Sequence, residues 1–460
     1  MVHLMEDKEQ FECISPNTGK AFDRWTQTSN TEFDNSLKLL YNKSFAELSL
    51  TSSRAEALRM LSDAIEEGRE ELETLIVAEV GKTKAEANAE VDYAKSFLIY
   101  MSNLLSSSSF KEKIENDRFV HTVPLGLGLL ITPYNDPLAG ITRKLANCIG
   151  SGAGAIIKPP ELGIKTASKL EELVGLKKLD HLICFLRTRN RDIIKELMHS
   201  KEVGAISFTG STEVGKILSV NAGGALKRFI GELGGINPFV IFSDANVQKA
   251  VEDLVVRKTK AAGQACSAQN ILFVEKNVAN DVIGMIEQKF SKIEALPTDR
   301  YEHSIMGPIR TKTALENLYS FEKKLKQSGA KCLINDNQKY GGEGFLYNPT
   351  AYLCKEPKLF MEYEIFAPLL GICIFDNRHD LKQILKNNKQ PLVLYAYSQD
   401  HTFLHEFITS LNYGSMGLNN TGIQGAQAPT GGFKEAGLGR EGGIWGLNEF
   451  TTTINIKEVL

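Results

Sequence analysis

The sequence lacks any apolar run of the roughly 18–20 residues that a membrane-spanning helix needs. Its first residues, MVHLMEDKEQ, also lack the apolar core of a secretion signal. The formal net charge of the 460 residues is only −3, so no excess of positive charge favours nucleic acid or an anionic membrane surface. We therefore expect a soluble protein that has neither a membrane nor a nucleic acid as its partner.

Cysteine is scarce as well. The seven cysteines are an odd number, lie scattered along the chain and include no C-x-x-C pair. This usage is typical of reduced thiols and favours a cytoplasmic location. Histidine is equally dispersed: His401 and His405 would share one face of a helix, but no third ligand accompanies them, so we expect no metal site.

What is present is the composition of a globular protein, with 42% hydrophobic and 24% charged residues. The length exceeds that of one ordinary core and predicts two or more domains. From residue 126 to residue 231, short strand-like runs alternate with helix-like runs, and a second such series begins at Phe239–Phe242. The alternation predicts an α/β fold with two open parallel sheets, and a boundary near Gly234–Gly235.

The segments that flank these two series have other patterns. Phe11–Trp25 reads as a short hairpin whose turn is Pro16–Gly19. Apolar residues recur at helical spacing in Ser53–Leu105. Residues 106–123 form a polar extended segment, and Leu447–Ile456, rich in Thr and Ile, predicts one more strand. We expect the extended segment to be an arm rather than a core strand.

One cysteine stands out by its surroundings. Cys266 lies in the small-residue stretch Ala262–Ser267, after a helix-like run that ends at Lys260 and before the strand-like run Ile271–Glu275. Small neighbours leave the sulfur reachable from a cavity, and they let backbone N–H groups approach whatever it binds. Cys266 is therefore a candidate nucleophile, although a single cysteine is more often a buried core thiol.

Two glycine-containing stretches could bind a nucleotide phosphate. Gly437–Gly442 fits the letters of G-x-G-x-x-G, but it follows no clear strand and opens no βαβ unit. In Phe208–Gly215 a strand ends at Gly210 and a helix begins with Ser211 as its cap. The exposed N–H groups and the helix dipole at this second place favour a phosphate, although an ordinary helix start has the same letters.

Seven motifs, in order along nearly the whole chain, resemble those of the aldehyde dehydrogenase superfamily, and most closely its succinate-semialdehyde dehydrogenase-like branch. They are Ile131–Pro137, Lys158–Glu161, Phe208–Thr212, Gly231–Gly235, Gly263–Cys266, Glu364–Pro368 and Gly431–Lys434. The chain departs from the family pattern at Tyr134, Asp136, Pro160, Ala367 and Thr430. None of these departures removes a reacting group, but Asp136 puts the pocket wall in doubt.

The resemblance implies an aldehyde dehydrogenase-like fold, with two open-sheet α/β domains and a small β oligomerisation domain. On this chain the cofactor-binding domain would be residues 1–105 and 124–233, and the catalytic domain residues 234–440. Residues 106–123 and 441–460 would supply the oligomerisation arm and strand. A homodimer or homotetramer is the implied assembly.

The resemblance also implies oxidation of an aldehyde to an acid with a nicotinamide cofactor. The thiolate of Cys266 would attack the carbonyl, and Asn135 together with the Cys266 N–H would stabilise the oxyanion. Hydride transfer would leave a thioester, and Glu232 would be the general base for its hydrolysis. Lys144 matches a lysine that lies near the proton path in the family.

The implied cofactor is NAD, with NADP as the alternative. Glu161 would hydrogen-bond the ribose 2′-hydroxyl and repel a 2′-phosphate, an effect that Lys158 partly offsets. The other implied contacts are the pyrophosphate with Gly210 and Ser211, and the nicotinamide end with Glu364 and Phe366. Further cofactor contacts are expected from Thr132, Tyr134 and Leu233.

Two cations bear on the choice of aldehyde. If the stretch after Asn135 is helical, Arg143 lies two turns further on roughly the same face, about 12 Å deeper, and Lys260 could approach the same pocket. Two cations beside an aldehyde pocket are costly unless they meet an anion. The resemblance assigns both positions to the far carboxylate of succinic semialdehyde, but Lys260 replaces an arginine and Gly425 stands where that branch often has a serine.

Four interpretations follow from these residues. The first is a hydrolytic dehydrogenase for a short anionic semialdehyde such as succinic semialdehyde. The alternatives are a dehydrogenase for uncharged aliphatic or aromatic aldehydes, an enzyme that passes the acyl group to coenzyme A, and a catalytically silent relative. Glu232 argues against the acylating enzyme, and the complete set of Cys266, Asn135 and Glu232 argues against a silent protein.

Overall fold

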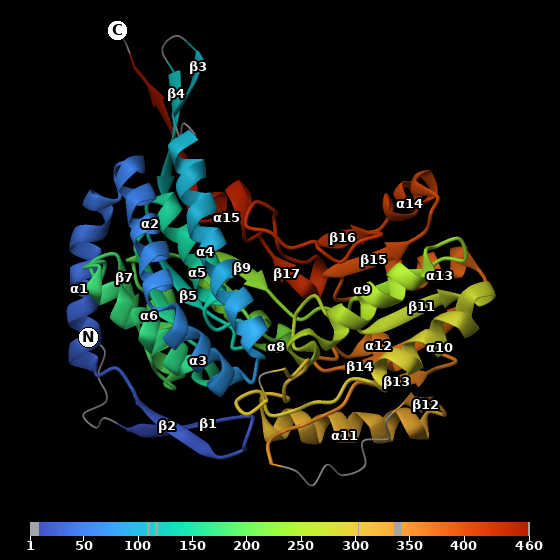
Figure 1. The fold of residues 1–460 in the computed structure, drawn as a ribbon. Helices are drawn as coiled ribbons and strands as arrows, with labels where there is room; N and C mark the ends of the chain where they lie inside the picture. The colour runs from blue at the N-terminus through green and yellow to red at the C-terminus, as the bar shows by residue number, and fades with distance from the viewer. Residues whose placement is uncertain (1–8, 108–110, 116–117, 302, 335–342, 459–460) are drawn as a thin grey trace.

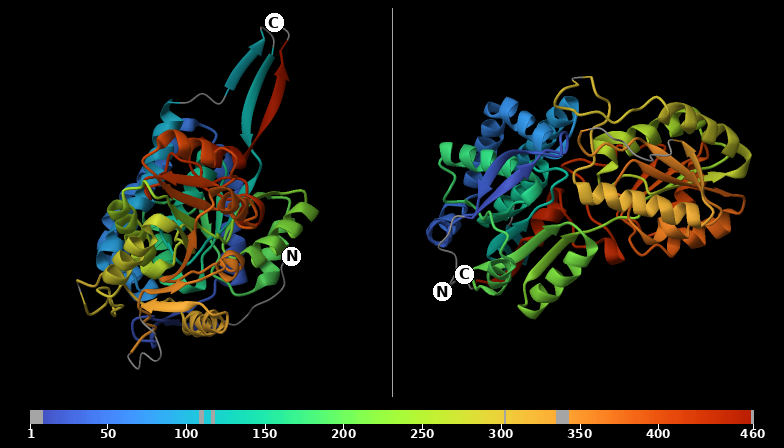
Figure 2. Two further views of the ribbon diagram at one scale, coloured as in Figure 1. Left: turned by 90° about the vertical axis from the view of Figure 1, so that its right-hand side faces the viewer. Right: turned by 90° about the horizontal axis from the view of Figure 1, so that it is seen from below.

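The computed structural model describes residues 9–107, 111–115, 118–301, 303–334 and 343–458. Two α/β bodies lie side by side, and a narrow β ribbon projects from the first of them (Figures 1 and 2). Each body is built on a sheet that is parallel except for one edge strand. The fold class predicted from the alternating pattern is confirmed.

The first body contains a six-stranded sheet in the order β17-β9-β8-β5-β6-β7. Its strands are β5 (Leu127–Ile131), β6 (Ala155–Lys158), β7 (Ile183–Phe185), β8 (Val203–Thr209), β9 (Arg228–Glu232) and β17 (Gly437–Leu438). Only β17 is antiparallel, and it comes from the stretch that we assign to the catalytic domain. The domain division itself stays a prediction.

Helices cover both faces of this sheet. They are α1 (Asn30–Glu47), α2 (Thr51–Glu67), α3 (Arg69–Val80), α4 (Lys84–Ser107), α5 (Ala139–Ser151), α6 (Ile164–Leu176), α7 (Arg191–His199), α8 (Thr212–Gly224) and α15 (Gly443–Glu449). Leu130 and Ile157 pack with α2–α6 on one face, whereas Leu129 and Ile156 pack with α1 and α7 on the other. Because both faces are buried, the strands read as continuous apolar runs in the sequence.

The second body contains a seven-stranded sheet in the order β12-β13-β14-β11-β10-β15-β16. Its strands are β10 (Pro238–Ile241), β11 (Ile271–Glu275), β12 (Lys331–Ile334), β13 (Thr350–Leu353), β14 (Leu369–Phe375), β15 (Val393–Tyr397) and β16 (Ser415–Leu418). Its helices are α9 (Val247–Thr259), α10 (Ala279–Phe290), α11 (Lys312–Gln327), α12 (Lys358–Glu362), α13 (Arg378–Lys386) and α14 (His401–Ile408). Helices α9 and α10 cover one face, and α11, α13 and α14 the other.

Short 3-10 helices and two small sheets complete the fold. The 3-10 helices are η1 (Glu161–Gly163), η2 (Lys260–Gly263), η3 (Lys276–Val278) and η4 (Lys434–Ala436). The predicted hairpin is β1 (Gln10–Ile14) with β2 (Ala21–Thr26), and the ribbon is β3 (Lys111–Glu115), β4 (Arg118–Pro124) and β18 (Thr451–Lys457). Strand β4 lies between β18 and β3, so the predicted arm and tail strand pair with each other. Within the described ranges no helix is both long and apolar enough to cross a membrane.

Candidate active site

The backbone that leads to Cys266 is strained within η2. Ala261, Ala262 and Gly263 all have positive φ, at 49°, 52° and 68°. A non-glycine residue in this left-handed region costs roughly 1–2 kcal/mol, and such strain gathers at functional sites. The side chain of Glu86, in the first turn of α4, accepts a hydrogen bond from Ala261 N at 2.6 Å. Helix α4 therefore holds the turn in its strained form.

The residues between this turn and the cysteine are fixed by the second body. Gln264 Oε1 accepts a hydrogen bond from Arg310 N at 2.8 Å, and its Nε2 donates to Pro308 O at 3.2 Å. A Cβ at position 263 would lie 2.5 Å from the backbone of Ala367, so only glycine fits there. Gly263 and Gln264 thus set the backbone that presents the cysteine.

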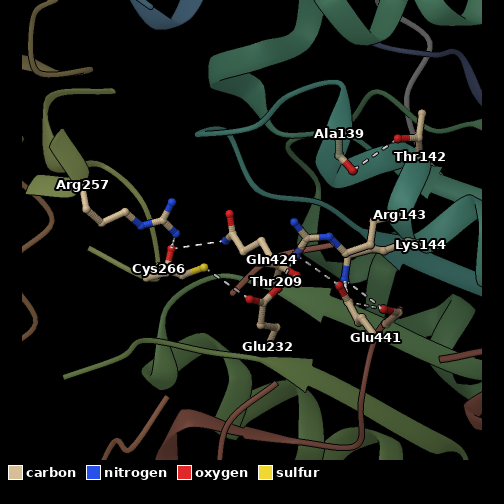
Figure 3. A network of polar contacts seen from close by, with 12 residues as sticks. Ala139, Thr142, Arg143, Lys144, Thr209, Glu232, Arg257, Cys266, Gln424 and Glu441 are labelled. Atoms are coloured by element: carbon tan, nitrogen blue, oxygen red, sulfur yellow. Dashed lines mark hydrogen bonds and ion pairs between the residues drawn. The ribbon is translucent and has the colours of Figure 1, made fainter. Parts of the chain in front are cut away.

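The thiol of Cys266 points at a buried carboxylate (Figure 3). Its Sγ donates to Glu232 Oε1 at 3.3 Å, and Glu232 Oε2 accepts from Arg143 Nη1 at 3.1 Å. Burial raises the pKa of the Glu232 carboxyl, and Arg143 opposes this rise. Burial, and then the nearby Glu232 charge, raise the pKa of the Cys266 thiol. The thiol and the buried carboxyl are therefore in direct hydrogen-bond contact.

A row of alternating charges continues behind Glu232. Arg143 Nη1 lies 3.9 Å from a Glu441 carboxylate oxygen, and Glu441 is also ion-paired with Lys144. Lys144 donates a further hydrogen bond of 2.9 Å to Ser207 Oγ. Neighbouring residues of α5 therefore bring two cations to the two buried carboxylates, which satisfies charges that burial alone would penalise.

Arg143, which the sequence argument placed near the aldehyde pocket, packs against α4 and β9. Its guanidinium stands over the ring of Phe97, 5.1 Å from the centroid, and behind Glu232 as seen from the thiol. It is absent from the lining of the cavity that reaches Cys266. The Glu232 carboxylate of β9 lies between Arg143 and the thiol, and the role of Arg143 in substrate binding stays a prediction.

The cavity in front of Cys266 has a volume of about 340 Å³. It is lined by Lys82, Glu86, Ala89, Glu90, Tyr93, Asp136, Arg257, Lys260, Ala261, Gln264, Ala265, Cys266, Thr421, Gly422 and Gln424. Lys260 lies on its wall, as predicted from the sequence. Asn135, half-buried between β5 and α5, precedes the lining residue Asp136, and its oxyanion role stays a prediction.

A second cavity, of about 470 Å³, opens at the carboxyl ends of β5, β6 and β8. Thr132, Lys158 and Glu161 line it, together with Arg189 and Arg191. The cavity lies where the chain connections on the two sides of β5 run in opposite directions, which is the usual nucleotide site of an open sheet. The buried Thr132 Oγ1 has no hydrogen-bond partner, and burial lowers the pKa of Lys158. These groups fit a polar, anionic cofactor.

Gly210 and Ser211, which we predict to contact the pyrophosphate, lie at the edge of this second cavity. Ser211 accepts a hydrogen bond from Val214 N at 3.4 Å and so caps α8, directly after Gly210. The side chain of Leu233 packs against Gly215, where a Cβ would lie 2.3 Å from it. The contact brings the start of α8 close to the residue after Glu232. An anion at the helix start would meet free backbone N–H groups.

The residues predicted for the nicotinamide end lie between the two bodies. Glu364 Oε1 accepts from Gly235 N at 3.1 Å, and burial raises the pKa of Glu364 to about 7. The rings of Phe366 and Tyr134 meet edge to face, with centroids 6.2 Å apart. The structure thus brings the predicted residues of β5, β9 and the segment before β14 toward one junction.

Four functional candidates were missed in the sequence. Lys82, Arg257 and Gln424 line the cavity of Cys266, and Glu441 closes the buried charge row. Arg257 could have been found, because it lies one helical turn before Lys260 and so shares its face. Gln424 and Glu441 come from loops far along the chain, and no periodicity marks them.

Comparison with known proteins agrees with this geometry. The chain matches the aldehyde dehydrogenase family over residues 3–456. It is 33% identical to a succinate-semialdehyde dehydrogenase of Paenarthrobacter nicotinovorans, over 87% of this chain and 90% of that one. It is 29% identical to a non-phosphorylating aspartate-semialdehyde dehydrogenase of Halomonas elongata, over 87% and 82% of the chains. The crystal structure of succinate-semialdehyde dehydrogenase from Burkholderia pseudomallei superposes with a TM-score of 0.91 at 26% identity, over 97% of this chain and 94% of that one.

The fold and these comparisons together define an α/β oxidoreductase. The chain belongs to the aldehyde dehydrogenase family, and it is an NAD(P)-dependent enzyme that oxidises aldehydes.

Proposed function

We propose that the protein oxidises a short anionic semialdehyde, such as succinic semialdehyde, through a thioester on Cys266. The observation that carries the chemistry is the 3.3 Å hydrogen bond from the Cys266 thiol to Glu232 Oε1 at the end of the substrate cavity. The thiol gives up its proton to water, and the sulfur adds to the aldehyde carbon to give a thiohemiacetal anion. The amide of Asn135 and the Cys266 N–H stabilise that anion.

The cofactor supplies a hydride acceptor when it is bound. The residues present fit it: Thr132, Lys158 and Glu161 line the cavity at the ends of β5 and β6, and Glu364 and Phe366 lie at the junction between the two bodies. Loss of hydride from the thiohemiacetal leaves the acyl group on sulfur. Glu232 then removes a proton from the water that hydrolyses this thioester.

NAD is the cofactor that we expect to be preferred, because the Glu161 carboxylate would repel a 2′-phosphate. The preference should be modest, since Arg189 lies 3.0 Å from Glu161 and Lys158 lines the same cavity. A comparison of kcat/KM for the two cofactors at one aldehyde concentration tests this point. A higher value with NADP would contradict it.

The choice of an anionic aldehyde rests on Lys260, which lines the cavity of Cys266, and on the semialdehyde substrates named for the relatives. An uncharged aldehyde is the alternative. Transfer of the acyl group to coenzyme A is disfavoured, because Glu232, the base that activates water, is already hydrogen-bonded to Cys266.

The test measures NADH formation from succinic semialdehyde and from butanal, with and without coenzyme A. Faster turnover with butanal would overturn the anionic substrate, and a requirement for coenzyme A would overturn hydrolysis.

The assembly and the location of the protein remain proposals as well. Within the described ranges the outer edges of β3 and β18 pair with no further strand, which favours a homodimer or homotetramer. No disulfide forms among the described residues, which favours a cytoplasmic location.

A further inference from the structure

Asp136 brings a carboxylate to the wall of the cavity in front of Cys266, at one of the positions where the chain departs from the family pattern. Its side chain is 33% exposed, although it is ion-paired with the buried Lys82. It directly follows Asn135, the residue that we expect to stabilise the oxyanion. After burial and the Glu232 charge, the charge of Asp136 is a further cause that raises the pKa of the Cys266 thiol. The carboxylate therefore lies close to a substrate held at the sulfur.

Three acidic residues line this cavity, and nearly all of their carboxylate oxygens are engaged. Both oxygens of Glu86 accept backbone N–H groups, at 2.6 and 2.9 Å. One oxygen of Glu90 accepts a backbone N–H at 2.9 Å, and the other accepts from Lys82 Nζ at 2.7 Å. Asp136 Oδ1 accepts from the same Nζ at 2.6 Å. Within the described ranges, Asp136 Oδ2 is thus the carboxylate oxygen of this cavity that has no hydrogen-bond partner.

The charge on Asp136 is only partly compensated by its surroundings. The ammonium of Lys82 lies against both Glu90 and Asp136, so one buried positive charge serves two carboxylates. Burial raises the pKa of the Asp136 carboxyl, but the nearby cations, Lys82 first, outweigh burial and leave the pKa below its usual value. The group is therefore ionised at neutral pH. A half-buried negative charge with a free oxygen favours a cationic hydrogen-bond donor on the ligand.

The same cavity also presents positive charge. Arg257 and Lys260 line it, and within the part of the chain that the structure describes neither forms an ion pair with Asp136. Because charges of both signs face one space of about 340 Å³, a short ligand with one group of each sign matches the wall better than a simple anion does.

We propose that Asp136 binds an ammonium group on the aldehyde chain, so that the preferred substrate is a short semialdehyde that carries an amino group as well as a carboxylate. The inference rests on the proposed function and deepens it, because it adds a second recognised group to the same semialdehyde. Lys82 is the positioning residue: it holds Oδ1 and leaves Oδ2 for the substrate.

The test compares kcat/KM for aspartate semialdehyde and succinic semialdehyde. The first compound is the second with an ammonium group next to its carboxylate, so the ratio of the two values isolates the contribution of the ammonium. We expect the wild type to prefer aspartate semialdehyde by about 10- to 100-fold, mainly through a lower KM, because a charge-assisted hydrogen bond is gained. A wild-type ratio near one would overturn the inference without any variant.

Two variants locate the effect. Asp136→Asn should bring the ratio to within about threefold of one, because a carboxamide loses the charge that attracts the ammonium. The variant strands no buried charge, since Lys82 stays paired with Glu90. Asp63→Asn is the matched control, because it removes one negative charge from an exposed position of α2, and it should keep the wild-type ratio. An Asp136→Asn ratio equal to that of the wild type would contradict the assignment to Asp136.

A second measurement does not depend on turnover. Calorimetric titration of the wild type should show aspartate binding at least tenfold more tightly than succinate, with malate, which has a hydroxyl in place of the ammonium, between them. Asp136→Asn should bind aspartate and succinate about equally. Tighter binding of malate than of aspartate would overturn the ammonium site. If succinic semialdehyde is oxidised faster than butanal but the ammonium gives no gain, the inference falls while the proposed function stands. A wild type that prefers butanal to both semialdehydes would overturn both.

Discussion

At the scale of single residues, the site depends on the placement of charges that water does not reach. The side chain of Glu232 is only 2% exposed, and it accepts hydrogen bonds from both Cys266 and Arg143. Burial raises the pKa of the Cys266 thiol, which favours its neutral form.

Substitution of the nucleophile is the simplest prediction at this scale. Cys266→Ala should abolish dehydrogenase turnover, to below about a thousandth of the wild type, because the covalent intermediate cannot form. NAD affinity and thermal stability should stay unchanged, since the side chain is small and the turn is held by Glu86 and Gln264. Steady-state assay, calorimetry and a melting curve check these points. Turnover above that threshold would remove Cys266 from its role.

A pH dependence is expected for the carboxyl that we assign to the nicotinamide end. The pKa of Glu364 is raised to about 7, so below that pH the group is protonated and loses the negative charge that makes it a strong acceptor for a ribose hydroxyl. Cofactor affinity should therefore rise as the pH increases through 7. The same shift makes the folded state bind this proton more tightly, so the Glu364 contribution to stability is present at low pH and is lost as the pH rises through 7.

The measurement is the Kd of NAD between pH 5.5 and 8.5, a range that brackets the pKa of about 7. Glu364→Gln is the control, because it keeps the shape of the side chain and removes its titration. A wild-type profile as flat as that of the variant would contradict the assignment.

At the scale of elements, helix α4 has a role beyond packing. Glu86 in its first turn holds the strained backbone at Ala261, and Lys82 just before it holds Asp136 on the cavity wall. A helix of the first body thus fixes the catalytic turn of the second.

The prediction is that Glu86→Ala lowers kcat at least tenfold, because the turn relaxes and Cys266 moves from Glu232. The free energy of unfolding should fall by only about 1–3 kcal/mol, the cost of one buried donor left unpaired. Glu70→Ala, in the first turn of the neighbouring helix α3, is the control. Equal activity of the two variants would show that the strained turn needs no support from α4.

The elements also show what a sequence can predict. The strands from β5 to β9 were found because their two buried faces leave uninterrupted apolar runs. Helix α1 was missed, although Ser29 and Glu32 form a capping box at its start, because few of its residues are buried. The motif residues around Cys266 were found by resemblance. The pairing of Arg143 with Glu232 was not predicted, because a contact between α5 and β9 is tertiary and leaves no local pattern in the sequence.

At the scale of the whole molecule, the projecting ribbon is the feature that the two bodies do not explain. Ile454 and Ile456 of β18 are 47% and 39% exposed, on a strand that pairs on one edge with β4. Exposed apolar side chains beside an unpaired edge favour contact with a second copy.

We expect sedimentation at micromolar concentration to give a dimer or a tetramer. The double variant Ile454→Lys and Ile456→Lys should shift the equilibrium toward smaller species, since it places charge on the contact surface. Double substitution by lysine at the exposed Leu226, at the end of α8, and at Val256, on α9, is the control. A wild-type monomer would contradict the proposed assembly.

The covalent step is the central claim, and trapping it tests that claim most directly. Glu232→Gln should still transfer hydride when given NAD and succinic semialdehyde, but it should hydrolyse the thioester slowly, because the base for water is lost. We predict one initial burst of NADH, with peptide mass spectrometry showing a succinyl group on Cys266 and on none of the other six of the seven cysteines. A burst without an acyl group on Cys266, or an equal loss of burst and steady turnover, would contradict the mechanism.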